Sequence, residues 1–379
     1  MKTTQHRVTV GLVLATLAFG LGACSAEAPA QADGDAPAVT TTTDMDALVE
    51  AAKAEGTLTL YGDASDASLK AWTDAFTAEY GISATIVRNA TGPLYQQFAQ
   101  EASAGQNQAD LISLLDHTAL DQAIDNKWIA PYTPEGADAL PAEYARDGYY
   151  YSMQNVTVPV IAYNTDKVTP EEVEKLQADP MGFLAQKGMT DRIGVVAPQA
   201  GQQLQAYWYL YSDGPAGGDY GWTNLEGIAA NTGTISDTVT VGQAVVQGEV
   251  DFGLPLADSY VISLITGSGA PLGFVYPDPS VVVTSALAVA QEAPHPNAAR
   301  LFDEWASSQD GVAAWAKAAN NEPMRTDVDD PRSYLEEPWF TPRSDDPWTD
   351  FGTDQEFLDA MKADGPYFPK WNETFGYAG

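Results

Sequence analysis

The chain has 379 residues, of which 52 are acidic and 18 are Lys or Arg, so its formal net charge at pH 7 is −34. A surface this negative repels nucleic acid and anionic lipid, and we exclude both as binding partners. Salt screens such charge within about 8 Å, so most carboxylates favour solubility rather than capture of cations.

The first 23 residues have the pattern of a signal peptide. Lys2 and Arg7 form a short positive region, and residues 8–21 form an apolar run too short for a membrane-spanning helix. Cys24 is the only cysteine, so the chain has no internal disulfide. A lone cysteine after small residues resembles a bacterial lipobox, which implies cleavage before Cys24 and lipid attachment to it. An ordinary secretory signal followed by a chance cysteine is the alternative.

Residues 24–44 are predicted to be a disordered tether. They are rich in Ala, Pro, Asp and Thr and have almost no large apolar side chains, so they cannot bury enough surface to fold. The remaining chain has the length of two ordinary domains.

Strand-like and helix-like patterns alternate after the tether. Residues 57–61 alternate between polar and apolar side chains, which predicts a strand, and Leu69, Trp72, Phe76 and Tyr80 share one face of a helix. Further strands are predicted at 83–88, 110–115, 192–196, 251–256 and 281–290, and further helices around 94–98 and 202–210. This alternation predicts an α/β fold with helices around mainly parallel sheets.

Two apolar stretches, Val156–Tyr163 and Ser285–Gln291, are each predicted to be a long strand that crosses between two lobes. Pro159 in the first stretch is expected at an edge or a bend, because proline lacks the amide that a central strand needs.

The chain changes character beyond Pro323, where acidic and aromatic residues dominate. We expect this tail to wrap over the body with its aromatic side chains docked, and a carbohydrate-stacking surface is the alternative. The aromatic residues concerned are Trp339, Phe340, Trp348, Phe351, Tyr367, Phe368 and Trp371.

Several stretches, taken in chain order, resemble a known family. They include "LVEAAKAEGTLTLYGDAS", "VIAYNTDKV", "RIGVVAP", "AVVQGEVDFGL" and "APHPNAARLFDEWASSQDGVAAWAKA". Over about residues 46–325 the chain resembles bacterial extracellular solute-binding proteins of the ferric-ion-binding type. The tail after Asp327 departs from the pattern of that family.

The resemblance implies an α/β, two-lobed periplasmic-binding-protein-like fold (type 2) with a hinge between the lobes. The implied division is 45–155 for the first part of lobe 1, 156–280 for lobe 2, 281–325 for the return to lobe 1, and 326–379 for an acidic, aromatic C-terminal extension. The implied protein is a bacterial lipoprotein on the extracellular face of the cytoplasmic membrane, which closes on a solute and delivers it to the permease of an ABC importer. We expect a monomer that touches the membrane only through its lipid anchor and has no cofactor.

Three loops after predicted strands supply helix starts at the cleft that this fold implies. They are Asp63–Ser65, the stretch Thr91-Gly92-Pro93 with Thr91 as candidate N-cap, and the stretch Gln199-Ala200-Gly201-Gln202. In open α/β sheets, ligands bind beyond the carboxyl ends of the strands, where helix N-termini point inward. Each dipole contact with an anion contributes roughly 0.3–1 kcal/mol. We therefore predict that these loops bind the solute.

In the ferric binders, the resemblance implies that paired tyrosines, an acidic residue and a histidine hold the metal, while an exogenous anion completes the shell. The second tyrosine matches Tyr260, and the acidic residue matches Asp116. The first tyrosine falls on Ser259, the histidine on Ser65, and an anion-binding glutamine on His117. Asp116 and Tyr260 are thus the metal ligands implied if iron is bound, because carboxylate and phenolate are hard oxygen donors.

Two classes of solute stay open at this point, and other polar solutes make up the remainder. One is iron(III), alone or bridged by an anion, and the other is a small organic anion such as a phosphonate, a phosphate ester or a carboxylate. Tyr260, which follows Asp258 and Ser259, is either a phenol facing the cleft or an aromatic side chain packed at a strand-to-helix turn. We count all three residues as ligand-binding candidates.

No enzymatic activity is predicted. The sequence has no Gly-x-Ser-x-Gly elbow and no His-Glu-x-x-His motif. With 52 acidic residues, carboxylate pairs occur at any spacing by chance, so they do not indicate a glycosidase. A surface glycan-binding or adhesion lipoprotein is the alternative function, and an anchored hydrolase comes after it.

Overall fold

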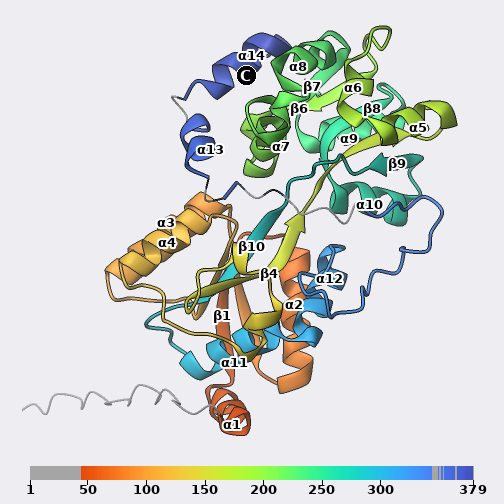
Figure 1. Ribbon diagram of the computed structural model, residues 1–379. Coiled ribbons are helices and arrows are strands. Elements are labelled where there is room, and N and C mark those ends of the chain that lie inside the picture. Colours follow the sequence, from red (N-terminus) through yellow and green to blue (C-terminus); the bar gives the residue numbers. More distant parts are fainter. Residues whose placement is uncertain (1–43, 344–348, 350, 353, 363–364, 379) are drawn as a thin grey trace, which may run out of the picture. The chain divides into compact units, whose positions relative to one another are not determined.

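The computed structural model describes residues 44–343, 349, 351–352, 354–362 and 365–378. The predicted signal peptide, Cys24 and the tether up to residue 43 lie outside the described residues. The described chain forms two mixed sheets with helices, which confirms the predicted α/β class (Figure 1).

The first lobe is built on a sheet with the strand order β2-β1-β3-β10-β4. Its strands are β1 (Thr57–Gly62), β2 (Ser83–Arg88), β3 (Leu111–Leu114), β4 (Tyr150–Thr157) and β10 (Val283–Val289). Its helices are α1 (Met45–Glu55), α2 (Asp66–Tyr80), α3 (Thr91–Ser103), α4 (His117–Asp125), α11 (Pro296–Ser307) and α12 (Gln309–Ala319).

The second lobe is built on a sheet with the order β7-β6-β8-β5-β9. Its strands are β5 (Pro159–Asn164), β6 (Ile193–Val196), β7 (Thr232–Ser236), β8 (Phe252–Ala257) and β9 (Leu272–Val275). Its helices are α5 (Pro170–Ala178), α6 (Pro180–Ala185), α7 (Gln202–Ser212), α8 (Gly221–Ala230), α9 (Thr238–Gln247) and α10 (Asp258–Ser268); α13 (Gln355–Ala360) and α14 (Tyr367–Phe375) follow in the tail.

The expectation of mainly parallel sheets is wrong. β1 runs parallel to β2 and β3, and β6 runs parallel to β7 and β8. However, β10 runs antiparallel to β3 and β4, and β5 runs antiparallel to β8 and β9. The reversal follows from strands that enter each sheet from the other lobe rather than through a helix of the same lobe.

One of the two predicted crossing strands crosses between the sheets. The stretch Val156–Tyr163 divides at Val158 into the end of β4 and the start of β5, and Pro159 is the first residue of β5. The other prediction is wrong, because β10 pairs with β3 and β4 within the first sheet (Figure 1). Residues 276–282, between β9 and β10, make the second crossing instead.

Local patterns explain why α2 forms where it does. Leu69, Trp72 and Phe76 are buried on one face, as their spacing predicts. Ser65 caps the start of the helix, and Gly81 ends it with φ of 74°, a left-handed conformation that glycine adopts without strain.

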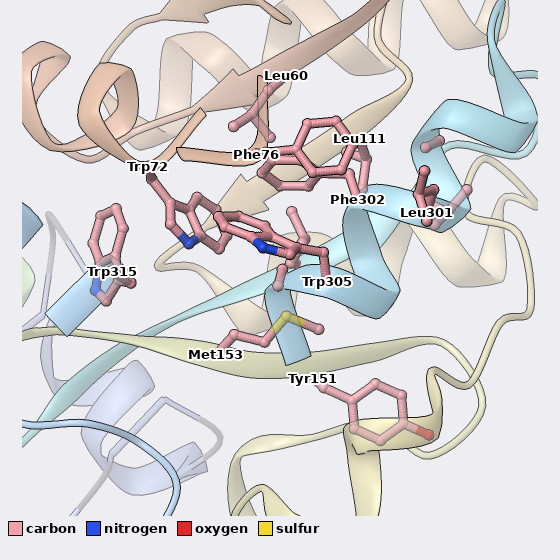
Figure 2. Packing of buried hydrophobic residues seen from close by; sticks show 14 of the residues in the cluster. Leu60, Trp72, Phe76, Leu111, Tyr151, Met153, Leu301, Phe302, Trp305 and Trp315 are labelled. Carbon is pink, nitrogen blue, oxygen red and sulfur yellow. The ribbon is translucent and has the colours of Figure 1, made fainter. Parts of the chain in front are cut away.

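This apolar face packs into the core of the first lobe (Figure 2). The Trp72 ring lies edge-on to Phe302 at 4.9 Å between centroids, and Phe76 lies edge-on to Trp305 at 5.5 Å. Each fully buried large apolar side chain contributes about 1.5–3 kcal/mol, so this cluster fixes α2 and its N-terminus against α11.

The aromatic side chains of the tail are docked, as predicted. Phe351, Tyr367 and Trp371 are buried in the core of the second lobe, and Trp339 and Phe340 pack against it. Trp371 lies 5.7 Å from the ring of Trp208 in α7. The buried rings of Phe351, Tyr367 and Trp371 offer no face to a sugar, whereas Trp339 and Phe340 are half-buried. Trp348 lies outside the described residues.

Candidate functional site

The parallel strands β1, β2 and β3 end at one edge of the first sheet, and Asp63 ties the three loops there together. Its Oδ2 accepts hydrogen bonds from the hydroxyl of Thr91 at 2.8 Å and from the amide of Leu115 at 2.9 Å. Thr91 was predicted to be the N-cap of α3, but it is the first residue of that helix. Ala90 is the N-cap. The next residue, Gly92, is exposed, with open space where a Cβ would stand.

Burial raises the pKa of Asp63, which is 7 % exposed. Its hydrogen bonds and the positive charge of Arg88 act in the opposite direction and lower this pKa. The second carboxylate oxygen, Oδ1, is buried and has no hydrogen-bond partner among the described residues. Asp63 is therefore a buried residue that holds the loops after β1, β2 and β3 together at this edge.

Ser65 stands at the start of α2, where its hydroxyl caps the helix. Its Oγ accepts a hydrogen bond from the amide of Ser68 at 3.1 Å and lies 2.8 Å from the hydroxyl of the same residue. Both hydroxyl groups therefore lie beside the positive end of the helix dipole.

Asp116 and His117 lie at the start of α4, and neither is directed at a solute by its contacts with other described residues. Asp116 is its N-cap, and its Oδ1 accepts a hydrogen bond from the amide of Ala119 at 3.0 Å. His117 is buried, with Nε2 3.5 Å from the hydroxyl of Thr284 in β10 and its ring 5.6 Å from that of Tyr150 in β4. His117 is therefore part of the interior of the first lobe.

In the second lobe, the loop after β6 is shared with the tail. The side-chain amide of Gln199 donates to Asn372 of α14 at 2.7 Å. Ala200 ends a short helix over Pro198–Ala200, and Gly201 occupies the N-cap position of α7.

Asp258, the first residue of α10, is buried and fixes the start of that helix. Its Oδ1 accepts hydrogen bonds from the amides of Val158 at 3.2 Å and Ser259 at 2.8 Å. The hydroxyl of Tyr276 donates to its Oδ2 at 3.2 Å. Burial raises the pKa of Asp258 to about 6. Because Val158 separates β4 from β5, this carboxyl links α10 to a crossing between the lobes.

Tyr260 packs against a neighbouring helix. Its hydroxyl lies 3.4 Å from the carbonyl oxygen of Val239, and its ring lies over Gly242 of α9. A Cβ at Gly242 would stand 2.5 Å from the Tyr260 ring, so glycine is required for this contact.

A cavity of about 210 Å³ is lined by residues of both lobes. Its lining residues come from the starts of α2, α7 and α10 and from α12, and they are Ala64, Ser65, Ser68, Gln203, Ala257, Ser259, Trp315 and Ala319. Among these described residues none is charged, and the polar groups are hydroxyls and one amide. Of the residues predicted to bind solute, the cavity thus brings together Ser65 and Ser259.

Sequence reasoning missed Ser68, Gln203 and Trp315. Ser68 lies one turn after Ser65, and Gln203 directly follows a predicted residue, so both lay within reach of the helix-start argument. Trp315 carried no signal beyond its place on an apolar helix face, because its contribution depends on α12 lying beside α2.

A larger cavity, of about 510 Å³, lies elsewhere on the first lobe among α1, α2 and α11. Two of its four acidic residues bond to neighbouring side chains: Glu79 accepts from the indole of Trp305 at 2.9 Å, and Glu304 accepts from the hydroxyl of Tyr132 at 2.6 Å. It contains none of the predicted site residues.

No group of three or more His, Cys, Asp or Glu side chains in the described part of the chain is arranged to hold a metal ion. Likewise, no helix described by the structure combines the length and hydropathy needed to span a bilayer.

Two mixed α/β sheets and a cavity lined from both lobes define a two-lobed binding protein of the type 2 periplasmic class. The family model of bacterial extracellular solute-binding proteins matches residues 71–342, which is 272 of the 379 residues. The chain belongs to this family, whose members bind solutes and need no cofactor to do so. Among proteins with curated descriptions, none matches this chain in sequence.

Solved structures agree with this assignment. Iron-bound HitA from Pseudomonas aeruginosa is 25 % identical and matches with a TM-score of 0.60, over 76 % of this chain and 90 % of its own. FutA (IdiA) from Trichodesmium, in complex with iron and citrate, is 19 % identical, with a TM-score of 0.62 over 85 % of this chain and 98 % of its own. AfuA from Actinobacillus pleuropneumoniae, with fructose-6-phosphate bound, is 17 % identical, with a TM-score of 0.58 over 86 % of this chain and 100 % of its own.

Proposed function

We propose that this protein is the membrane-anchored solute receptor of an ABC importer and that its solute is a small organic anion, such as a phosphate ester or a phosphonate. The observation that carries this proposal is the cavity of about 210 Å³. Its described lining residues offer hydroxyl and amide groups at three helix starts and no charged side chain.

Helix starts favour an anion over a neutral solute of the same size. Each helix N-terminus acts as about half a positive charge and presents amide groups without partners inside the helix. Three such ends, at α2, α7 and α10, contribute residues to one cavity. Ser65 and Ser259 add hydroxyl donors, and Gln203 adds an amide, so a phosphate or phosphonate group finds several neutral donors.

Iron(III) is less well supported as the solute. A hard trivalent ion needs anionic oxygen ligands, and the family positions for a histidine and a tyrosine hold the neutral residues Ser65 and Ser259. Tyr260 packs on α9, and the Oδ1 of Asp116 caps α4. HitA and FutA are described as binding iron, whereas AfuA is described with fructose-6-phosphate, and this chain's residues fit the second class better.

The binding step requires no covalent chemistry. Solute contacts α2 of the first lobe and α7 and α10 of the second, so rotation about the crossings at 157–159 and 276–282 closes the lobes around it. Micromolar affinity corresponds to about −8 kcal/mol. A few hydrogen bonds to a charged group, at about 1.5–3 kcal/mol each, supply that free energy.

The anchor and the delivery step complete the proposal. Lipidation at Cys24 would hold the receptor on the outer face of the cytoplasmic membrane, and residues 24–44 would let it reach the permease. The signal-peptide pattern and the small residues directly before Cys24 support this step.

Isothermal titration calorimetry of the purified chain tests the solute class directly. The titrants are inorganic phosphate, methylphosphonate, fructose 6-phosphate and iron(III) citrate. We expect at least one phosphorylated or phosphonate titrant to bind, and Ser259→Asp to weaken binding. At a separation of about 5 Å and an effective dielectric constant of about 20, one added charge repels the anion by about 3 kcal/mol, roughly a hundredfold in Kd.

Ser263→Asp is the matched control, because it adds the same charge to the exposed surface of α10, one turn beyond the cavity. Its affinity should stay within a few-fold of the unmodified protein. Binding of iron(III) citrate with a visible tyrosinate-to-iron band that disappears in Tyr260→Phe would overturn the anion assignment and favour metal capture.

A further inference from the structure

The C-terminal tail is bonded to a crossing between the lobes. The amide of Thr349 donates to the carbonyl oxygen of Ser280 at 3.0 Å, and the amide of Val282 donates to that of Thr349 at 3.2 Å. Residues 276–282 connect β9 of the second lobe with β10 of the first. Thr349 therefore pairs with the crossing at Val281, in a single parallel bridge beside the hinge.

Directly after this contact, the tail touches both lobes. Phe351 lies edge-on to Tyr209 of α7, 5.3 Å between ring centroids, and stacks on Phe357 of α13 at 5.2 Å. The carbonyl oxygen of Gly352 accepts a hydrogen bond from the hydroxyl of Thr118 in α4, at 3.4 Å. Phe351 is 3 % exposed, so its ring is fully enclosed.

These residues fill the space between the lobes on one side of α7. There only about 10 Å³ remains, among Leu115 from the end of β3, Gln202 and Ala206 from α7, and Phe351, Gly352 and Phe357 from the tail. The residue next to Gln202, Gln203, instead lines the cavity of about 210 Å³. Gln202 and Gln203 are adjacent in α7, yet Gln202 faces the filled space and Gln203 faces the open cavity.

We propose that Phe351 is a specificity-determining residue that closes the α4–α7 side of the space between the lobes to solutes. The solute is then confined to the side between α2 and α10, and Phe351 sets an upper limit on its length. The closure itself depends only on packing, whereas the choice of test solutes rests on the function proposed above.

The test compares Phe351→Ala with Phe375→Ala. Both remove the same ring from a buried position of the tail, but Phe375 packs on Trp208 and Trp371 and does not line either cavity. Calorimetry with n-alkylphosphonates from methyl to hexyl measures the size limit. We expect Phe351→Ala to bind hexylphosphonate at least tenfold more tightly than the unmodified chain, with methylphosphonate unchanged within about twofold, and Phe375→Ala to keep the original profile.

A second measurement requires no solute. Ala206→Cys, in a chain whose Cys24 is replaced by Ser, places one thiol in the filled space, where Ala206 is buried. Its reaction with an aromatic disulfide reagent should accelerate at least tenfold when Phe351→Ala is added and stay slow when Phe375→Ala is added. If Phe351→Ala does not fold, Phe351→Leu gives the same comparison with a smaller opening.

The outcomes separate the two proposals. Equal thiol rates with both ring deletions, or an unchanged phosphonate profile in Phe351→Ala, would overturn the role of Phe351. If no phosphonate, inorganic phosphate or phosphate ester binds any of the proteins, the anionic solute class fails, and a thiol that reacts faster only with Phe351→Ala still supports the closure.

Discussion

Asp258→Asn tests whether burial raises the pKa of the Asp258 carboxyl at the start of α10. The substitution keeps an oxygen to accept from the amides of Val158 and Ser259 and offers an NH₂ group to the hydroxyl of Tyr276. It removes the ionisable proton, the attraction to Arg332 and the acceptor of the Tyr276 hydroxyl proton. The variant should therefore fold with its hydrogen bonds from Val158 and Ser259 in place and the bond to Tyr276 reversed in direction.

The expected magnitude follows from linkage between protonation and folding. Burial raises the pKa of Asp258 from 3.8 to about 6, so the folded protein holds this proton more tightly than the unfolded chain does. The resulting stabilisation is complete below the unfolded value and is lost as the pH rises through about 6. At about 1.36 kcal/mol per unit, the loss is about 3 kcal/mol, most of it between pH 4 and pH 7.

Urea unfolding of both proteins at pH 4.5, 6 and 7.5 measures this loss. The free energy of unfolding of the unmodified chain, minus that of Asp258→Asn, should fall steadily across the series, because contributions from the other carboxyl groups cancel in the difference. Asp237→Asn is the control that should show no trend across this series. Asp237 is an exposed N-cap whose hydrogen bonds lower its pKa from 3.8, so its stabilising contribution is complete at all three pH values and is lost only in more acidic solution.

A difference between the unmodified chain and Asp258→Asn that stays constant or rises with pH would refute the reasoning. Ionisation of Asp258 would then lower the free energy of unfolding very little. The amide of Val158 would donate to an ionised carboxylate at every pH tested.

Three further substitutions test the packing. Tyr260→Phe should change solute affinity by less than about twofold in calorimetry, since the hydroxyl makes only a 3.4 Å contact on α9, and a tenfold loss would place the phenol in the site. Glu55→Ala should lower the free energy of unfolding by about 1–3 kcal/mol in urea, because this carboxylate accepts from the amide of Ala298 at 2.7 Å at the start of α11 and has no substitute there. Trp371→Ala should lower it by about 3–5 kcal/mol, and a loss below 1 kcal/mol would show that the tail is not part of the core.

Sequence patterns predicted the local elements well, because those elements depend on neighbours in the chain. The alternation in 57–61 and the spacing of Leu69, Trp72 and Phe76 report directly on which side chains are buried. The direction of β10 was not predictable in this way. It depends on where the chain re-enters the first sheet after the whole second lobe, and no local pattern records that.

The candidate site shows the same limit at the scale of one residue. Successive side chains on a helix point about 100° apart, so a one-residue difference decides which neighbour a side chain meets. Ser259 lines the cavity, whereas Tyr260 packs on α9. The resemblance to a family identified the turn, but the side chain that faces the cavity depends on how α10 rotates against α9. The predicted solute-binding roles themselves stay predictions.

The strand order has a consequence for how the chain folds. β10 lies between β3 and β4, so the first sheet has no connection between these strands until residues 283–289 have been made. The second core, in turn, includes Trp371 and Phe375 from the last helix, α14. Because synthesis starts at the N-terminus, neither lobe can be completed early. Each lobe needs segments that are distant in sequence and are made late. Incomplete chains therefore leave apolar surface of both sheets uncovered.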